Sequence, residues 1–445
     1  MSARHVLVFP AGTEIGLEIQ HALKDCKEVR LFGAGQDIPN HGKFAYGEYH
    51  RLPHIGDPNW LPALQDLCET LSIDYIIPAY DDVIVALSRV SDQLSAAVIT
   101  SPREACEITR SKSQTYAALT GIVAVPHLYA DAADVDRFPV FVKPDRGQGS
   151  FGARRIENRE QLDAALADVP GSIICEFLPG EEYTVDCFSD RERGLLFAQA
   201  RGRRRVRNGI SVNSITQDIE GVPALAAKIG ARLGLRGAWF FQLKRAANGE
   251  LTLLEVAPRI AGAMALHRVT GVNFPLMSIF EHERKPLGIL VNPGEVEIDR
   301  ALVNRYRHSI SFATLYVDLD DTLILGDAVN TRLVALIFQC LNAGKRVNLI
   351  TRHASDLNAT LRRHRLSGLF DRVIHLRDGE SKADYIAEPD AIFIDDSFRE
   401  RLDVTKRLGI PTFDCSMIEM LTQQAESMNA RGASDVRERS VEGVS

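Results

Sequence analysis

The sequence predicts an α/β protein in which strands and helices alternate along most of the chain. Apolar runs at 5–10, 29–32 and 74–78 have the length and composition of buried strands, and helical periodicity occupies 15–24 and 61–71. Such alternation is typical of a doubly wound sheet with helices on its faces. The chain has 445 residues, and this length indicates roughly three domains.

Composition narrows the classes of function. The formal net charge is −7, which argues against a surface that coats nucleic acid. The 7 cysteines are scattered without CxxC spacing, as in reduced cytosolic proteins. No apolar stretch approaches the roughly 20 residues of a membrane helix, and residues 1–5 lead into a strand without a secretory pattern. We expect a cytoplasmic protein that binds neither nucleic acid nor membranes.

The turn after the first strand, residues 11–16, raises the question of dinucleotide binding. It contains Gly12 and Gly16 but lacks the GxGxxG spacing, whose glycines form the turn and admit the pyrophosphate. We therefore favour a substrate-binding or structural turn over an NAD site.

A second strand signal, 140–144, ends in Lys143 and continues into a glycine-rich segment that includes Gly147, Gly149 and Ser150. A lysine beside such a loop can place its ammonium and several backbone N–H groups around polyphosphate oxygens. Glycine-rich turns also serve backbone geometry alone. The segments after this loop favour the nucleotide interpretation.

Residues 173–186 read as a strand, a short hinge and another strand. Backbone groups of the hinge can meet an adenine edge, while the Glu182 carboxylate accepts hydrogen bonds from ribose hydroxyls. Next, strands at 239–244 and 251–259 flank Asn248-Gly249, a favoured tight-turn pair. Gln242 and Glu255 then point at one metal ion. An ordinary hairpin with polar residues on its solvent-exposed face remains an alternative.

Together these segments resemble the ATP-grasp superfamily, in particular its carbamoyl phosphate synthetase and amino-acid ligase branch, over about residues 1–310. The resemblance implies a Rossmann-like subdomain at 1–110 and a nucleotide-binding catalytic domain at 111–310, with ATP and Mg²⁺ as cofactors. It also implies roles for individual residues: Lys112 and Lys143 hold phosphates, Glu176, Phe177 and Leu178 form the adenine hinge, Glu182 binds ribose, Gln242 and Glu255 hold magnesium, and Arg259 binds the transferred phosphate or the substrate carboxylate.

Two features of this region leave alternatives open. The family usually has asparagine two positions after the metal-binding glutamate, where this chain has Ala257; water, Asp186 or Asp218 would then complete the coordination. The basic run 201–207 is either a solvated surface or a strand whose alternate arginines face the phosphates.

A different motif, Asp318-Leu319-Asp320-Asp321-Thr322, directly follows the apolar run 314–317. Residues i and i+2 of a strand point the same way, so Asp318 and Asp320 can reach one phosphorus. An Asp-rich turn that caps a helix is the alternative.

Three later segments favour phosphoryl chemistry. Thr351 follows the apolar run 347–350, Lys382 lies in a polar loop, and Asp395 and Asp396 follow the apolar run 391–394. An open α/β sheet binds its ligand at such strand ends.

This order of residues resembles the haloacid dehalogenase phosphatase superfamily over about residues 313–425. The resemblance implies that Asp318 accepts the phosphoryl group, Asp320 is the general acid and base, Thr351 and Lys382 hold phosphate, and Asp318, Asp320 and Asp395 surround magnesium. The spacing leaves no room for a large cap, so we expect a small-cap or capless domain. Either the substrate is bulky or another domain covers the site.

The combined hypothesis is a bifunctional enzyme. An ATP-dependent carboxylate–amine ligase would act on small-molecule carboxylate and amine substrates through an acyl phosphate, and a phosphatase would act on a related phosphorylated substrate or product. The family resemblance is compatible with a homodimer. Residues 426–445 read as a disordered polar tail. In one alternative the first module is a non-catalytic ATP-binding sensor or scaffold; in another the aspartate site is a regulatory phosphate-binding module.

Overall fold

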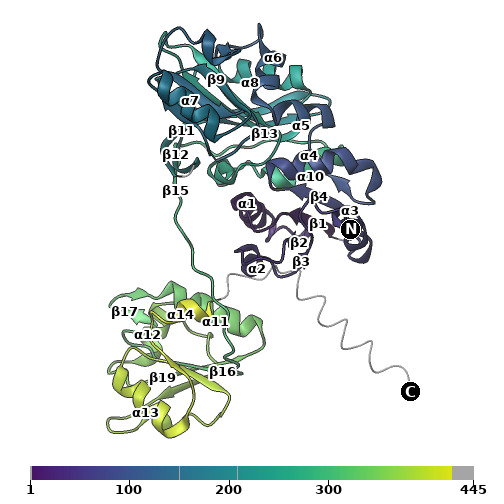
Figure 1. Ribbon diagram of the computed structural model, residues 1–445. Helices are drawn as coiled ribbons and strands as arrows, with labels where there is room; N and C mark the ends of the chain where they lie inside the picture. Colours follow the sequence, from purple (N-terminus) through teal and green to yellow (C-terminus); the bar gives the residue numbers. More distant parts are fainter. Residues whose placement is uncertain (1–2, 150, 208, 423–445) are drawn as a thin grey trace, which may run out of the picture. The chain divides into compact units, whose positions relative to one another are not determined.

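The computed structural model describes residues 3–149, 151–207 and 209–422, which form two compact units (Figure 1). The first unit extends to Leu302, and the second begins at Val303. The predicted tail at 426–445 lies outside the described residues, as does Ser150. No helix among the described residues is long and apolar enough to cross a bilayer.

The first unit begins with a parallel five-stranded sheet of order β3-β2-β1-β4-β5. Its strands are β1 (Arg4–Phe9), β2 (Val29–Gly35), β3 (Tyr49–Arg51), β4 (Tyr75–Pro78) and β5 (Ala97–Val98), and its helices are α1 (Glu14–Leu23), α2 (Gly42–Ala45), α3 (Trp60–Thr70) and α4 (Asp81–Val90). The predicted elements at 5–10, 15–24, 61–71 and 74–78 begin and end within one residue of β1, α1, α3 and β4.

The turn between β1 and α1 is tight. The Thr13 hydroxyl caps α1 by accepting a hydrogen bond from the Gly16 amide at 2.9 Å. A Cβ at position 16 would lie 2.6 Å from the Ala11 carbonyl oxygen, so only glycine fits there. This turn therefore has a structural role of its own, as one of the two sequence interpretations expected.

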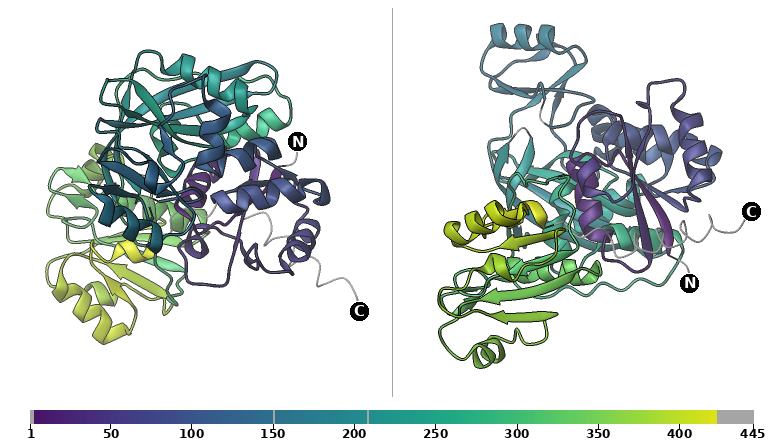
Figure 2. Two further views of the ribbon diagram at one scale, coloured as in Figure 1. Left: turned by 45° about the horizontal axis from the view of Figure 1, so that its top comes forward. Right: turned by 90° about the horizontal axis from the view of Figure 1, so that it is seen from below.

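Two antiparallel sheets come next (Figure 2). The four-stranded sheet, of order β6-β9-β7-β8, is covered by α7 (Arg159–Asp168) and consists of β6 (Leu128–Tyr129), β7 (Val140–Pro144), β8 (Arg154–Ile156) and β9 (Ser172–Glu176). The six-stranded sheet, of order β14-β13-β10-β11-β12-β15, consists of β10 (Glu182–Asp190), β11 (Gly194–Arg207), β12 (Ile210–Gln217), β13 (Gly237–Arg245), β14 (Leu251–Ala257) and β15 (Glu297–Asp299). The helices of this region are α5 (Arg103–Thr109), α6 (Lys112–Leu119), α8 (Val222–Leu233), α9 (Ala265–Arg268) and α10 (Phe274–His282).

Alternation along β13 gives the six-stranded sheet two different faces. Trp239 and Phe241 are fully buried and pack with residues of α8. Phe240 and Gln242 point the opposite way, into a cleft. The apolar face thus fixes the register that presents polar side chains on the other face.

The second unit is a parallel five-stranded sheet of order β20-β19-β16-β21-β22. Its strands are β16 (Thr314–Val317), β19 (Arg346–Thr351), β20 (Arg372–His375), β21 (Ala391–Ile394) and β22 (Thr412–Phe413), with a hairpin of β17 (Ile324–Leu325) and β18 (Ala328–Val329). Its helices are α11 (Thr331–Asn342), α12 (Leu357–Arg363), α13 (Phe398–Leu408) and α14 (Ile418–Leu421). Every residue of β16 and β21 is buried, as expected for central strands covered on both faces.

Candidate functional site

Two adjoining clefts open in the first unit. The larger has a volume of about 300 Å³ and the smaller of about 150 Å³. Both are lined by Lys112, Gly147, Gln148, Gly149, Arg203, Gly209, Gln242 and Glu255. These shared residues mark the junction where a ligand in one cleft would meet a ligand in the other.

The smaller cleft brings together residues that are far apart in the sequence. All the nucleotide-binding residues predicted among the described residues line it: Lys112, Lys143, Gly147, Gly149, Glu176, Phe177, Leu178, Glu182, Gln242 and Glu255. Phe141, Phe151 and Leu254 add apolar surface. A cleft with apolar surface and a few convergent polar groups is typical of a small-molecule site.

Both predicted phosphate-binding lysines are held in place. Lys143 is 7% exposed, and its Nζ donates to the Tyr116 hydroxyl at 2.6 Å. Burial lowers the pKa of Lys143 because the charged ammonium is poorly solvated there. A bound anion would stabilise the ammonium form, so this environment suits an anionic ligand. Lys112 is the first residue of α6, and its Nζ donates to the Gly147 carbonyl at 3.2 Å. The lysine of α6 is thereby tied to the glycine-rich loop.

Glu182 has an arginine partner that the sequence analysis did not single out. The Arg203 guanidinium pairs with the Glu182 carboxylate, donates to Gln242 Oε1 at 3.2 Å and donates to the Gly209 carbonyl at 2.7 Å. The arginines of the basic run 201–207 therefore have different surroundings. Arg203 lines both clefts, whereas Arg204 and Arg205 are exposed and pair with acidic residues of β15.

Gln242 and Glu255 lie directly opposite each other on β13 and β14. Their amide and carboxylate oxygens are hard ligands of the kind that Mg²⁺ binds together with substrate phosphates and water, so this pair fits the ion. Ala257 lines the larger cleft with a methyl group and supplies no ligand. Neither Asp186 nor Asp218 lines either cleft, and Asp186 is fully buried, so neither takes the place of the missing asparagine.

Arg259 lines the larger cleft and not the smaller one, and its side chain is already engaged. Its Nη2 donates to Asp81 at 3.0 Å, its Nη1 donates to the Ile260 carbonyl at 3.1 Å, and the guanidinium lies 5.0 Å from the centre of the Phe240 ring. Burial raises the pKa of Asp81, but the Arg259 charge and hydrogen bond outweigh it and lower that pKa overall. Arg259 is therefore a cationic side chain held in a fixed position in the lining of this cleft.

The second unit holds a separate polar site at the carboxyl ends of adjacent parallel strands. Asp318 follows β16, Thr351 ends β19 and Asp395 follows β21. Lys382 is 3% exposed and donates to Asp318 at 2.7 Å and to Asp395 at 2.6 Å. Because β16 pairs with both β19 and β21, the sheet brings these strand ends together.

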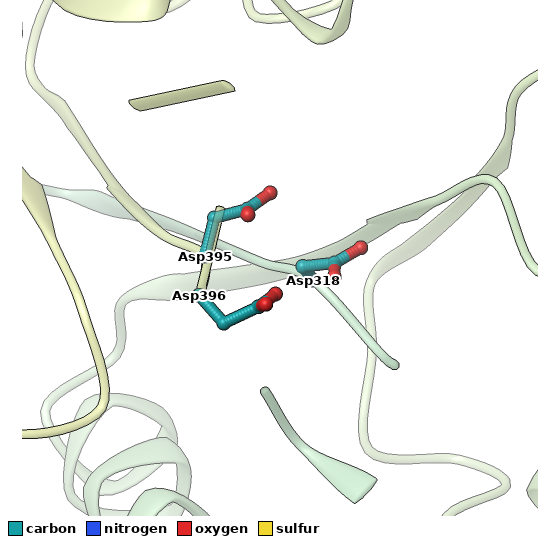
Figure 3. Close-up of side chains that lie close together, drawn as sticks. All are labelled: Asp318, Asp395 and Asp396. Carbon is teal, nitrogen blue, oxygen red and sulfur yellow. The ribbon is translucent and has the colours of Figure 1, made fainter. Parts of the chain in front are cut away.

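Three carboxylates gather at this site (Figure 3). Oxygen atoms of Asp318, Asp395 and Asp396 lie within 4.8 Å of one another. Burial raises the pKa of Asp318 to about 6, with the charge of Asp395 adding to the effect and Lys382 opposing it. The pKa of Asp395 is raised as well, again mainly by burial. Three converging carboxylates fit a hard divalent cation such as Mg²⁺.

The structure places the Asp320 side chain outside this cluster. It is half exposed and accepts a hydrogen bond from Nδ1 of His353 at 2.9 Å, while Nε2 of that histidine lies 2.8 Å from the Thr360 hydroxyl. Asp396, the residue after Asp395, joins the cluster and accepts a hydrogen bond from the Thr322 hydroxyl at 3.1 Å. Sequence reasoning missed His353, although its place two residues after Thr351 puts it in the same strand-end loop.

Comparisons with known proteins agree with the geometry of the first unit. Residues 168–293 match a family model described as "ATP-grasp in the biosynthetic pathway with Ter operon". The structure is similar to the biotin carboxylase domain of 2-oxoglutarate carboxylase from Hydrogenobacter thermophilus, solved with MgADP, ADP and bicarbonate (TM-score 0.57, 16% identity, 67% of this chain and 74% of that chain). It is also similar to an L-amino acid ligase from Bacillus licheniformis (TM-score 0.53, 17% identity, 64% and 75%).

The first unit has the ATP-grasp fold. Among curated proteins, the chain is 26% identical over 168 residues to a D-alanine–D-alanine ligase of Fusobacterium nucleatum, covering 34% of this chain and 57% of that protein. The first curated relatives are 31% identical over 71 residues, and the match spans only 22% of their length. These matches are partial.

Proposed function

We propose that the ATP-grasp unit is an ATP-dependent carboxylate–amine ligase that forms an amide or peptide bond. The observation that carries this proposal is the convergence of all the described nucleotide-side residues on one cleft that joins a second, basic cleft. The partial similarity to D-alanine–D-alanine ligases and to an L-amino acid ligase supports the same reaction class. We also propose that residues 1–110 and 111–310 form separate domains and that the protein is cytoplasmic. A homodimer stays a prediction.

In this reaction a carboxylate oxygen of the acid attacks the γ-phosphorus of ATP, and ADP leaves with the electrons of the broken P–O bond. The amine nitrogen then attacks the acyl carbon, loses a proton and displaces phosphate. Lys112 and Lys143 would neutralise the phosphates, and the hinge 176–178 would hold the adenine. Mg²⁺, bound by Gln242 and Glu255, would offset charge on the phosphate oxygens. Positioning and charge neutralisation supply most of the catalysis in such transfers.

The test is ADP release with a panel of acids and amines, compared with ATP binding. We expect ADP release that depends on both substrates, and its loss in Lys143→Met. A sensor or scaffold is the second candidate, since Ala257 supplies no metal ligand and Arg259 is held by Asp81. ATP binding without ADP release for any pair would favour the sensor.

For the second unit, over about 313–425, we infer a haloacid dehalogenase-like phosphatase without a large cap. Its support is the approach of Asp318, Asp395 and Asp396 around Lys382. The Asp318 carboxylate would attack the phosphorus, and Asp320 would give a proton to the leaving alcohol. Water, deprotonated by Asp320, would then attack the aspartyl phosphate and release phosphate.

Asp318→Asn removes the nucleophile and is expected to abolish hydrolysis of an aryl phosphate. Asp327→Asn is the matched control, because this carboxylate is largely exposed and pairs only with Arg363 among the described residues. Hydrolysis that persists in Asp318→Asn would refute the assignment. Phosphate binding without turnover in the unaltered protein would instead indicate a regulatory module.

A further inference from the structure

More basic than acidic side chains line the larger cleft of the ATP-grasp unit. Its lining contains six arginine or lysine side chains and three carboxylates: Arg110, Lys112, Arg201, Arg203, Arg259 and Arg300 against Glu14, Asp81 and Glu255. Lys112 and Arg203 also line the nucleotide cleft, but the other four basic residues do not. Arg110, Arg201 and Arg203 pair with carboxylates that lie outside this lining, so the donors left without partners decide which anion the cleft can bind.

Three of these four arginines, Arg110, Arg201 and Arg259, pair with carboxylates. Arg110 donates to Asp82 at 2.7 Å, and Arg259 is held by Asp81. Their charges are balanced locally. Two arginines stand apart: among the described residues, Arg201 has a buried nitrogen without a partner, and Arg300 has no carboxylate within hydrogen-bond distance.

Arg300 directly follows β15, and its backbone amide donates to the Val212 carbonyl at 2.7 Å. Its guanidinium lies against Gly262: a Cβ at that position would be 3.0 Å from Nη2. The nearest carboxylate oxygen is that of Glu14, at 3.8 Å. This separation is too long for a hydrogen bond. Glycine at 262 thus makes room for a guanidinium whose donors are not taken up by the described residues.

Arg201 reaches the same cleft from β11. It is 3% exposed, and its Nε and Nη2 donate to Asp186 at 2.8 and 3.3 Å. Its Nη1 is buried and has no hydrogen-bond partner among the described residues. His267 lies 3.4 Å from Asp186, and burial lowers the pKa of this histidine, so it is uncharged at neutral pH. A buried donor left unpaired is costly, and a ligand oxygen would satisfy it.

We propose, resting on the ligase function above, that the acid substrate carries a second anionic group, a carboxylate or a phosphate monoester, which Arg300 binds with Arg201 as a further donor. The reacting carboxylate lies at the junction with the nucleotide cleft, because the γ-phosphate must reach it there. Arg300 lines only the larger cleft, so it meets a different part of the acid. Guanidinium groups match both kinds of anion through paired N–H donors.

Binding of simple probes tests this proposal without any turnover. Calorimetric titrations would use the whole chain in an Asp318→Asn background, which prevents hydrolysis of a phosphate probe, with Mg²⁺ and a non-hydrolysable ATP analogue. Succinate is compared with propionate, and 2-phosphoglycerate with glycerate; a dianion here means a probe with two anionic groups, and a monoanion a probe with one. We expect one dianion to bind at least about tenfold more tightly than its monoanionic partner, the range of a charged hydrogen bond. Which dianion is preferred distinguishes a dicarboxylate from a phosphorylated acid.

Arg300→Ala should bring the affinity for that dianion to within about twofold of the monoanion, and Arg300→Lys should give an intermediate value because a single ammonium lacks the paired donors. Arg204→Ala is the matched control, since this exposed arginine pairs with Glu297 and lines neither cleft. Tryptophan fluorescence checks folding, and Arg300→Gln replaces the alanine variant if that variant unfolds.

Equal or undetectable binding of the dianions and monoanions would overturn the proposal, as would unchanged dianion affinity in Arg300→Ala. The proposed ligase fails on a different result, namely the absence of ADP release. A dianion preference that depends on Arg300 without ADP release would support this binding site while removing the reaction.

Discussion

Replacing Asp318 by asparagine is expected to stabilise the second unit at neutral pH while it removes the proposed nucleophile. Asp318 is 6% exposed, and burial raises its pKa to about 6, although Lys382 opposes the shift. In an unfolded chain the same carboxyl would ionise near pH ~3.9. The folded state therefore binds more protons than the unfolded state between these two values.

The size of the effect follows from linkage. Stability falls with rising pH wherever the folded state binds more protons, so it is lost between about pH 4 and 6. Two pKa units at ~1.4 kcal/mol each correspond to about 3 kcal/mol at pH 7. Asparagine has the shape of the protonated acid without its charge, and Lys382 can still donate to the amide oxygen and to Asp395. We expect a gain of about 1–3 kcal/mol.

Hydrogen exchange read by mass spectrometry on peptides of β16 and β21 measures this gain in the second unit alone. In buffer with EDTA at pH 7, exchange through unfolding of that unit should slow by roughly 5- to 150-fold. The difference between variant and unaltered protein should shrink as the pH approaches 4, because Asp318 is then protonated too. Asp320→Asn is the control; its half-exposed side chain should change stability by no more than about 0.5 kcal/mol.

Faster or unchanged exchange in Asp318→Asn at pH 7 would refute the reasoning. It would mean that the ion pair with Lys382, at 2.7 Å, outweighs the burial of the carboxylate. Stabilisation of the same size in Asp320→Asn would also refute it, since burial would then not be the cause.

Three further predictions concern the ATP-grasp unit. Asp186→Asn leaves the Arg201 charge buried without its partner and should lower the free energy of unfolding by about 3–5 kcal/mol. Urea unfolding followed by tryptophan fluorescence measures this loss, because both tryptophans lie in this unit. Asp299→Asn breaks an exposed pair and should cost less than about 1 kcal/mol, and equal losses in the two variants would contradict the role of burial. Lys143→Met should weaken binding of a fluorescent ATP analogue by at least about tenfold, the range of a charged hydrogen bond, and undiminished affinity would exclude Lys143 from the nucleotide site. Ala257→Asn should lower the Mg²⁺ concentration that gives half-maximal ADP release; an unchanged value would show that a third side-chain ligand is dispensable.

Local patterns were sufficient for much of the fold and of both sites. The limits of α1 and α3 followed from periodicity, and the Asn248-Gly249 turn placed Gln242 opposite Glu255. Strand ends located Asp318 and Asp395, because an apolar run that stops at a carboxylate marks the edge of a parallel sheet. In each case the signal lies within one or two adjacent elements.

Long-range packing decided what the sequence left open. No residue near Glu182 in the sequence predicts its pairing with Arg203. The sequence also did not show which arginines of the basic run are exposed, because the acidic partners of Arg204 and Arg205 come from β15, far along the chain. By itself the sequence predicted which side chains are suited to phosphate and magnesium, since that prediction depends on residue type and local spacing. Only the tertiary structure decided which charged groups have a hydrogen-bonded partner and which, like the Arg300 guanidinium, have no carboxylate of the described residues within hydrogen-bond distance, because pairing depends on segments brought together by the fold.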